Sequence, residues 1–325
     1  MFMEASVTHN LREAGKAYRE ERWSACAHLA KKVVTTAPQK THAWRFAGAA
    51  AFHLGDLDDA LIAFEKVIEL GQLVGDISSD DWLNLASVLD QPQRSDLYER
   101  AEVAYRQALA LNPDRREPVL RQLAALLRSQ FRFNDARALL NPELENARAV
   151  GDHSAEAQLL NALGAIALEE GRWLAALPLV KAACVADPQY AEAQFSLALG
   201  LLATGDYAAG WPLHEWRWKV SQAKDKWREY GQPWAGEPLE QRILLIWEEQ
   251  GLGDVLQFSR FLPHMRSLYS EAGLIFVCRS SLHPVLANMA EREQISLLPA
   301  ESAIPGRVQG HDVHVPLLSL PLHLG

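Results

Sequence analysis

Apolar residues follow two different spacings along this 325-residue chain. Over roughly residues 7–220 they recur at i, i+3, i+4 and i+7, which is the spacing of amphipathic helices with one buried face. Beyond residue 240 the apolar residues form short continuous runs, ILLIW at 243–247 and LIFVC at 274–278. Such runs suit parallel strands that are covered on both faces. The pattern predicts a mainly α chain in which a helical region precedes a smaller α/β region.

The helical region has an internal period of 34 residues. Small residues at the same place in the pattern are 34 positions apart, from Ala14 to Gly48 and again from Gly164 to Ala198. Amphipathic helices alone would fit any helical bundle, but a 34-residue recurrence with glycine at the turn favours a solenoid of helix pairs. We count six units, beginning near residues 7, 41, 79, 117, 157 and 191, and three of them close on a proline, namely Pro38, Pro113 and Pro188.

Small side chains stand where paired helices should approach each other most closely. Five positions of this kind recur, Gly48, Ala86, Ala124, Gly164 and Ala198. Two units depart from the pattern. The third has about three extra residues around 91–95, and the fourth lacks both the turn glycine and the closing proline.

Residues 7–220 resemble tetratricopeptide repeats. In the second unit the residues at the family's marked positions are Trp44, Ala47, Gly48, Gly55, Ala60 and Phe64. The resemblance implies a superhelix whose groove binds an extended peptide, so a protein or peptide is the expected partner.

The next stretch of sequence is rich in tryptophan: Trp211, Trp216, Trp218, Trp227 and Trp234. The rings have two interpretations, a stacking platform for sugars or bases, or large apolar groups buried at a domain junction. Glycine and proline at positions 231, 233, 236 and 238 then mark a boundary. We therefore expect a repeat domain over 1–220, a Trp-rich linker over 221–240 and a partial α/β domain over 241–325.

The α/β region reads as a βαβαβ unit. After the strand at 243–247 a helix is expected with one apolar face, interrupted by Pro263; this face comprises Val255, Phe258, Phe261, Leu262, Met265 and Leu268. A second helix is expected at 281–290 and a third strand at 295–298. The first two strands should be adjacent and parallel.

The turn after the first strand is the most suggestive candidate site. It follows the carboxyl end of a predicted parallel strand, where open α/β sheets place ligands, and Gly251 and Gly253 let its backbone turn tightly. Leu256 replaces the third glycine of the dinucleotide fingerprint and no G-K-[ST] follows, so neither a nicotinamide nor an ATP site, nor any cofactor, is predicted. Asp254 is either a helix cap or a general base.

Three stretches are similar to bacterial glycosyltransferases that carry amino-terminal tetratricopeptide repeats. They are GWPLHEWRW with the later PWAGEPL, then ILLIWEEQGLGDVLQFSRFLP, and DVHVPLLSLP. The middle stretch also looks like the first βα unit of heptosyltransferases. The resemblance implies the GT-B fold, in which two Rossmann-like domains face each other, one binding the acceptor and the other a nucleotide-sugar. Carried over by motif, Asp254 is the catalytic base, and the acceptor-side residues are Gln250, Gly251, Gly253, Gln257, Asp312 and His314.

The chain departs from this family in length. Only about 90 residues follow the boundary at residue 236, and two doubly wound domains need well over twice that number. The donor-binding half is therefore expected to be absent. Three interpretations stay open: a protein-binding repeat protein with a partial domain, an active transferase that receives its donor half from elsewhere, and a scaffold whose α/β segment only caps the last helix pair.

Charge and cysteine content narrow the choice of partners. The formal net charge of −9 repels phosphate backbones and disfavours nucleic acid. Cys26, Cys184 and Cys278 lie far apart without a C-x-x-C pair, and His311 and His314 are expected on opposite faces of a strand, so no metal site is predicted.

The sequence shows neither a secretory signal nor an apolar run of membrane-spanning length, so a cytoplasmic location is expected.

Overall fold

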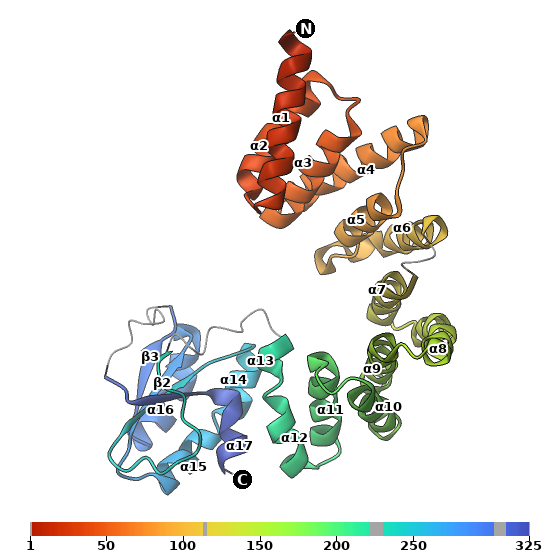
Figure 1. Ribbon diagram of the computed structural model, residues 1–325. Coiled ribbons are helices and arrows are strands. Elements are labelled where there is room, and N and C mark those ends of the chain that lie inside the picture. Colours follow the sequence, from red (N-terminus) through yellow and green to blue (C-terminus); the bar gives the residue numbers. More distant parts are fainter. Residues whose placement is uncertain (1, 113–115, 221–229, 302–309, 325) are drawn as a thin grey trace. The chain divides into compact units, whose positions relative to one another are not determined.

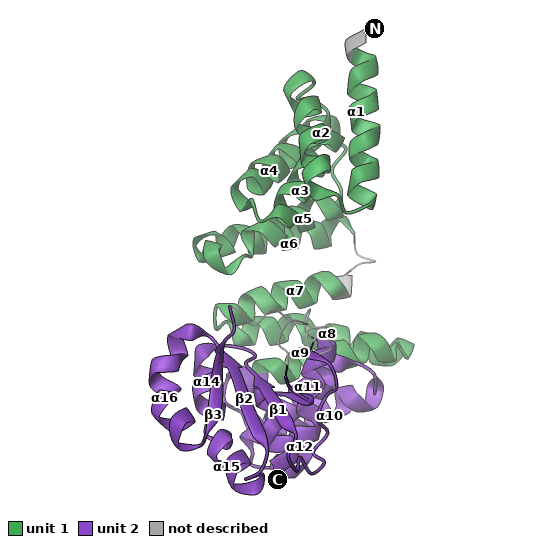
Figure 2. Cartoon of the chain, turned by 90° about the vertical axis from the view of Figure 1, so that its left-hand side faces the viewer, with its two compact units in different colours: residues 1–166 green, residues 167–325 purple. Residues whose placement is uncertain are grey.

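The computed structural model describes residues 2–112, 116–220, 230–301 and 310–324. The chain divides into two compact units, residues 1–166 and residues 167–325 (Figures 1 and 2). Within the described residues no helix is long and apolar enough to cross a bilayer. Of the residues singled out above, Pro113 and Trp227 lie outside the described ranges.

The first unit is entirely helical. Its helices are α1 (Phe2–Arg19), α2 (Trp23–Thr36), α3 (Thr41–Leu54), α4 (Leu57–Val74), α5 (Ser79–Leu89), α6 (Tyr98–Leu111), α7 (Arg116–Ser129), α8 (Phe133–Val150) and α9 (His153–Glu169), which enters the second unit. A short 3₁₀ segment, η1 (Pro92–Leu97), separates α5 from α6. From α1 to α8 each helix packs against the next, which gives the predicted series of helix pairs.

Where a short turn joins the two helices of a pair, its backbone is left-handed. Gly55 supplies it between α3 and α4 with a φ of 85°. The fourth unit has no glycine there, and Phe131 adopts the same region with a φ of 60°. A side chain with a Cβ atom is disfavoured in this region by about 1 kcal/mol, so this turn is held by the packing of the helices that it joins.

Glycine is required for space at Gly48. A Cβ atom added there would lie 2.8 Å from the ring of Phe64, so α3 can approach α4 only because no side chain intervenes. The other four small residues singled out in the sequence, Ala86, Ala124, Gly164 and Ala198, are also buried.

Ion pairs join successive repeats in the first unit. Arg45 on α3 donates two hydrogen bonds to Asp81 on α5, at 2.7 and 2.8 Å. Burial raises the pKa of Asp81, but the hydrogen bonds from Arg45 and Ser78 outweigh it and lower this pKa below its usual value. Because Asp81 also accepts the backbone N–H of Ser78, one carboxylate both caps α5 and holds it to α3.

The second unit begins with helices and ends with a parallel sheet. Its first helices are α10 (Trp173–Ala186), α11 (Ala191–Ala203), α12 (Tyr207–His214) and α13 (Arg217–Val220). The strands are β1 (Ile243–Trp247), β2 (Gly273–Cys278), β3 (Ile295–Pro299) and β4 (Val313–Pro316), in the order β3-β2-β1-β4. All pairs are parallel, which confirms the predicted pairing of the first two strands. A strand was expected around His311 and His314, and the structure shows it as β4, a fourth strand beside β1 that the βαβαβ unit did not include.

The outer edge of β4 is covered by a short neighbouring segment. His314 donates its backbone N–H to Gln232 O at 3.0 Å and accepts the N–H of Trp234 at 2.7 Å. Pro233 forms the parallel bridge to His314 between these two bonds.

The helices that follow the strands are α14 (Leu252–Phe258), α15 (Phe261–Leu268), α16 (His283–Arg292) and α17 (Leu320–Leu324), with the 3₁₀ segments η4 (Ser280–Leu282) and η5 (Leu317–Ser319). The helix expected after β1 is thus two helices. The break comes at residues 259–260, and Pro263 falls in the first turn of α15, where a proline is tolerated. Leu268 was expected on the apolar face, but it is 52% exposed because it ends α15.

Both faces of the sheet carry tryptophan from the preceding segment. Trp211 and Trp234 pack with the core formed by one face of the sheet and its helices. Trp218 packs on the other face, against Trp247 at a ring distance of 5.6 Å. These contacts favour the junction interpretation of the aromatic cluster over a stacking platform.

The contact at Gly48 predicts a loss of stability when this residue is replaced by leucine. The added side chain must displace the Phe64 ring, and overpacking of this kind costs about 1–3 kcal/mol. Urea unfolding followed by circular dichroism measures the change. His9→Leu, at an exposed position of α1, is the control and should change stability little. Equal stabilities for the two variants would contradict the close approach of α3 and α4.

Candidate functional site

The turn after β1 is held in a strained conformation by an arginine from the end of β2. Gln250 has a φ of 69°, which is uncommon for a residue with a side chain. Arg279 donates to Gln250 O at 2.8 Å and to the carboxylate of Glu248 at 2.9 Å. The position of this turn is therefore fixed by β2.

Asp254 stands at the third position of α14, and its Oδ2 accepts the N–H of Gly251 at 3.0 Å. It closes the first turn of the helix from inside, whereas the sequence placed it as a cap in front of the helix. Gly251, Gly253 and Gln257 are exposed around it, and Asp254 itself is half-buried. Together with Gln250 these residues form one rim at the carboxyl edge of the sheet.

Asp312 and His314 are not part of this rim. Asp312 precedes β4, and its Oδ2 accepts the N–H of Ile243 at 2.7 Å, at the opposite end of β1. Four residues of strand, about 13 Å, lie between this end and the carboxyl edge. His314 lies inside β4, fully buried, and its Nδ1 accepts the indole N–H of Trp247 at 3.2 Å. The structure thus brings together five of the seven candidate residues.

His311 lies before β4, outside the strand, with its Nε2 2.7 Å from Tyr230 O. Across residues 2–112, 116–220, 230–301 and 310–324, no three His, Cys, Asp or Glu side chains gather in a way that would hold a metal ion.

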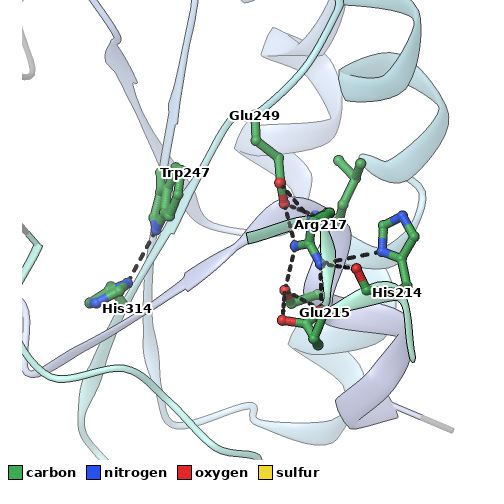
Figure 3. A network of polar contacts seen from close by, with 8 residues as sticks. His214, Glu215, Arg217, Trp247, Glu249 and His314 are labelled. Atoms are coloured by element: carbon green, nitrogen blue, oxygen red, sulfur yellow. Dashed lines mark hydrogen bonds and ion pairs between the residues drawn. The ribbon is translucent and has the colours of Figure 1, made fainter. Parts of the chain in front are cut away.

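A buried guanidinium, which the sequence analysis did not single out, lies at the carboxyl edge of the sheet and bonds to several segments around it. Arg217 on α13 donates from Nε and Nη2 to the two carboxylate oxygens of Glu249, at 2.9 and 2.8 Å (Figure 3). Only 4% of the Arg217 side chain and 8% of the Glu249 side chain are exposed. Such a two-point pair fixes both the position and the orientation of the two groups.

The remaining donors of Arg217 are also used. Nη1 donates to Glu215 Oε1 at 2.6 Å and to His214 O at 3.2 Å, and Nη2 donates to Ser319 Oγ at 2.7 Å. Ser319 in turn donates to Glu215, and Glu249 accepts the backbone N–H of Leu318. The network therefore ties α13 to the segments that follow β1 and β4.

The network joins the three stretches on which the glycosyltransferase resemblance depends. GWPLHEWRW contributes Glu215 and Arg217, the stretch after β1 contributes Glu249, and DVHVPLLSLP contributes Ser319. A usable signal was present in the sequence. Glu215 and Arg217 alternate with tryptophans, and a charge within such an apolar setting needs a partner when it is buried.

The network occupies the point where the strand order reverses. The chain runs from β1 to β2 and β3 on one side and returns to β4 on the other, so the reversal lies between β1 and β4. Open α/β sheets bind ligands at the carboxyl ends of the strands at this point. Here Arg217 bonds to Glu249 after β1 and to Ser319 after β4, so the chain's own arginine occupies this point of the carboxyl edge. The exposed rim around Asp254 lies beside it on the same edge.

Burial and neighbouring charges shift the pKa values of the groups in this network. Two carboxylates face one guanidinium, and burial together with the charge of Glu215 raises the pKa of Glu249 more than Arg217 lowers it. Burial lowers the pKa of Arg217, but hydrogen bonds and charge from Glu249 and Glu215 more than offset this effect, so Arg217 stays charged. Burial and the charge of Arg217 lower the pKa of the neighbouring His214 to about 4, so it is neutral at pH 7.

The fold and the comparisons define a tetratricopeptide-type helical repeat protein that carries a small parallel sheet. The crystal structure of PilW, a type IV pilus biogenesis factor, matches with a TM-score of 0.50 and 16% identity, over 64% of this chain and 90% of PilW. YrrB, described as a tetratricopeptide-repeat protein with an unusual peptide-binding site, matches with a TM-score of 0.46 and 16% identity, over 57% of this chain and 88% of YrrB. At this identity the match to PilW shows the fold alone.

In sequence, the chain is 37% identical over 71 residues to protein FlbA of Caulobacter vibrioides. The matched stretch is 22% of this chain and spans only 12% of FlbA. No family model matches the chain.

Removing the guanidinium should destabilise the second unit strongly. Arg217→Met leaves Glu249 buried and unpaired, which costs about 3–5 kcal/mol, and adding Glu249→Met should restore much of this loss because no unpaired charge then remains at that position. Amide hydrogen exchange of β1 and β2 at increasing urea concentration measures the change in the second unit. Arg292→Met, which removes an arginine that is 70% exposed, is the matched control and should cost less than about 1 kcal/mol. A double variant less stable than Arg217→Met would contradict the role given to the buried charge.

Two buried histidines predict that the second unit loses stability in mild acid. Burial is the main reason that the pKa values of His214 and His314 fall from 6.5 to about 4 in the folded chain. The unfolded chain therefore takes up protons first, and the stability present above pH 6.5 is lost as the pH falls towards 4, by up to about 3 kcal/mol for each histidine. In the first unit the pKa of Asp81 is lowered from 3.8, so the stability that this carboxylate contributes is lost only as the pH falls below 3.8.

Amide hydrogen exchange at pH 7 and pH 5, corrected for the intrinsic rates, separates the two units. We expect protection to fall at pH 5 in β1, β2 and β4 and to persist in α2 to α5. His28→Gln, an exposed histidine of α2, is the control and should leave the pattern unchanged. Equal protection of the strands at both pH values would contradict the prediction.

Proposed function

We propose that this chain binds another polypeptide through its helical repeats, and that its α/β part is a glycosyltransferase-related domain without a complete donor site. The observation that carries the proposal is the stacked series of helix pairs, a fold that offers a long surface built from successive repeats. The proposed domain limits are those expected from the sequence, with repeats over 1–220, a linker over 221–240 and the α/β part over 241–325.

Two observations support the relation of the α/β part to glycosyltransferases. Its strand order, β3-β2-β1-β4, is the order of the first four strands of a doubly wound sheet. The stretches that carry the resemblance also meet in one buried network around Arg217, so they form a structural unit. The proposal takes this unit as the start of the acceptor-binding half of a GT-B fold.

The alternative function is sugar transfer with a donor half supplied by another domain. It is favoured by the place of Asp254, half-buried within the exposed rim at the carboxyl edge of the sheet. As the acceptor hydroxyl attacks the anomeric carbon, its proton would pass to the Asp254 carboxylate, while the bond to the nucleotide breaks and the nucleotide leaves. Gln250, Gly251, Gly253 and Gln257 would line the acceptor side, and the places of Asp312 and His314 suit structural support.

Binding measurements on the purified chain distinguish the two functions. Panning of a displayed library of twelve-residue peptides should yield binders, and calorimetry should confirm them with dissociation constants in the micromolar range. UDP-glucose, UDP-N-acetylglucosamine and ADP-heptose should release no heat of binding. Saturable heat with a nucleotide-sugar would contradict the absence of a donor site, and a library without binders would contradict the peptide-binding role.

Asp254→Asn tests the catalytic alternative. The amide oxygen can still accept the N–H of Gly251, so stability should change by less than about 1 kcal/mol. In an assembly completed by the donor domain of a full-length relative, transfer should fall at least a hundredfold, because an amide cannot accept the proton of the acceptor. Glu291→Gln, which neutralises an exposed carboxylate on α16 outside the rim, is the matched control and should leave transfer unchanged. An active assembly that transfers equally well with asparagine at residue 254 would exclude Asp254 as the base.

A further inference from the structure

The third repeat departs from the others on one side of the first unit. Its first helix, α5, has 11 residues where α3 has 14, and η1 replaces the short glycine turn. Insertions in repeat proteins fall on one face of the solenoid and often belong to a binding surface. Here η1 and the following α6 run beside α4, and the space between them is hollowed at two levels.

The hollow at the start of α4 is acidic. It has a volume of about 660 Å³ and lies between the turn before α4 and η1. Its charged lining consists of Asp56, Asp58, Asp59, Asp96 and Arg94. Four carboxylates against one guanidinium give a formal charge of 1 − 4 = −3, which attracts cations.

The hollow further along α4 is apolar. It has a volume of about 450 Å³, and its apolar lining consists of Ile68, Trp82, Leu85, Leu89 and Val103. Val103 is 55% exposed and Trp82 is half-buried, whereas Ile68, Leu85 and Leu89 are buried, so Val103 and Trp82 form the part of this surface that faces solvent. Glu65, Glu99 and Arg100 complete the lining. A tryptophan in an open apolar hollow is typical of the anchor positions of protein interfaces.

The two hollows share no lining residue, but both lie between α4 on one side and η1 or α6 on the other, and we call them together the α4/α6 furrow. An ion pair joins α4 to the η1–α6 segment at each hollow. Asp58 pairs with Arg94 at the acidic hollow, and Glu65 pairs with Arg100 at the apolar one. The two segments therefore stay side by side from one hollow to the other. From Asp59 to Ile68 the helix rises about 13 Å at 1.5 Å per residue, a span that about four residues of extended peptide cover.

We propose that the α4/α6 furrow docks a segment of the partner polypeptide that carries a lysine or arginine followed, about four residues later, by a large apolar side chain. The charge of the first hollow selects the basic residue, and the second hollow buries the apolar one. The inference rests on the proposed function, since it assumes that the repeats bind a polypeptide. It adds the surface and the chemistry of the partner.

Library panning against the wild-type chain and four variants tests the furrow. Asp59→Lys reverses a charge in the acidic hollow, and Val103→Glu places a charge in the apolar one; both residues are exposed, so both variants should fold. The matched controls lie on α8. Glu145→Lys changes an exposed acid of the same unit, and Val150→Glu changes a valine that is 70% exposed. Circular dichroism checks the fold of each variant.

We expect the wild-type chain to enrich peptides with the basic and apolar residues at this spacing. Calorimetry with one such synthetic peptide should show at least tenfold weaker binding for Asp59→Lys and for Val103→Glu, and unchanged binding for the two controls. Enriched peptides that lack the pattern, or that bind the furrow variants as tightly as wild type, would overturn the furrow and leave the peptide-binding role intact. A library that yields no binders would overturn both.

Discussion

The second unit depends on the burial of one guanidinium. Arg217 connects segments 32 and 102 residues away in the sequence, and each of its bonds is made inside the protein, where a charge without partners is costly. The planar geometry of the guanidinium therefore restricts how the segments around it can be arranged. The turn before α13, the turn after β1 and the segment after β4 must lie where Glu215, Glu249 and Ser319 reach the planar fork of Arg217, and this requirement sets the shape of the carboxyl edge of the sheet.

The first unit follows a different principle, because each of its bonds joins neighbours in sequence or in the next repeat. Arg45 reaches Asp81, 36 positions along, and Arg100 reaches Glu65, 35 positions back. Contacts of this range repeat nearly the period of the chain, so stability accumulates repeat by repeat. A local irregularity such as η1 can then change the surface of one repeat while its neighbours keep their packing.

Sequence reasoning recovered the features with a local cause. The 34-residue period, the glycine at position 48 and the continuous apolar runs of β1 and β2 are all visible within short windows. A strand was expected around His314, but its place beside β1 was not, because His314 interrupts an apolar run of only four residues and its burial depends on the partner Trp247. The separation of Asp312 from Asp254 could not be predicted for a related reason: motifs give the order of residues along the chain, whereas the parallel register puts these two at opposite ends of β1.

The segment along the outer edge of β4 has a further consequence for the behaviour of the protein at high concentration. Gln232 and Trp234 turn their backbone groups towards His314, so the groups of the residue between them point outward. That residue is Pro233, which has no N–H to offer. A strand from another molecule would meet an edge without a donor at this position, so this side of the sheet is protected against edge-to-edge growth into aggregates.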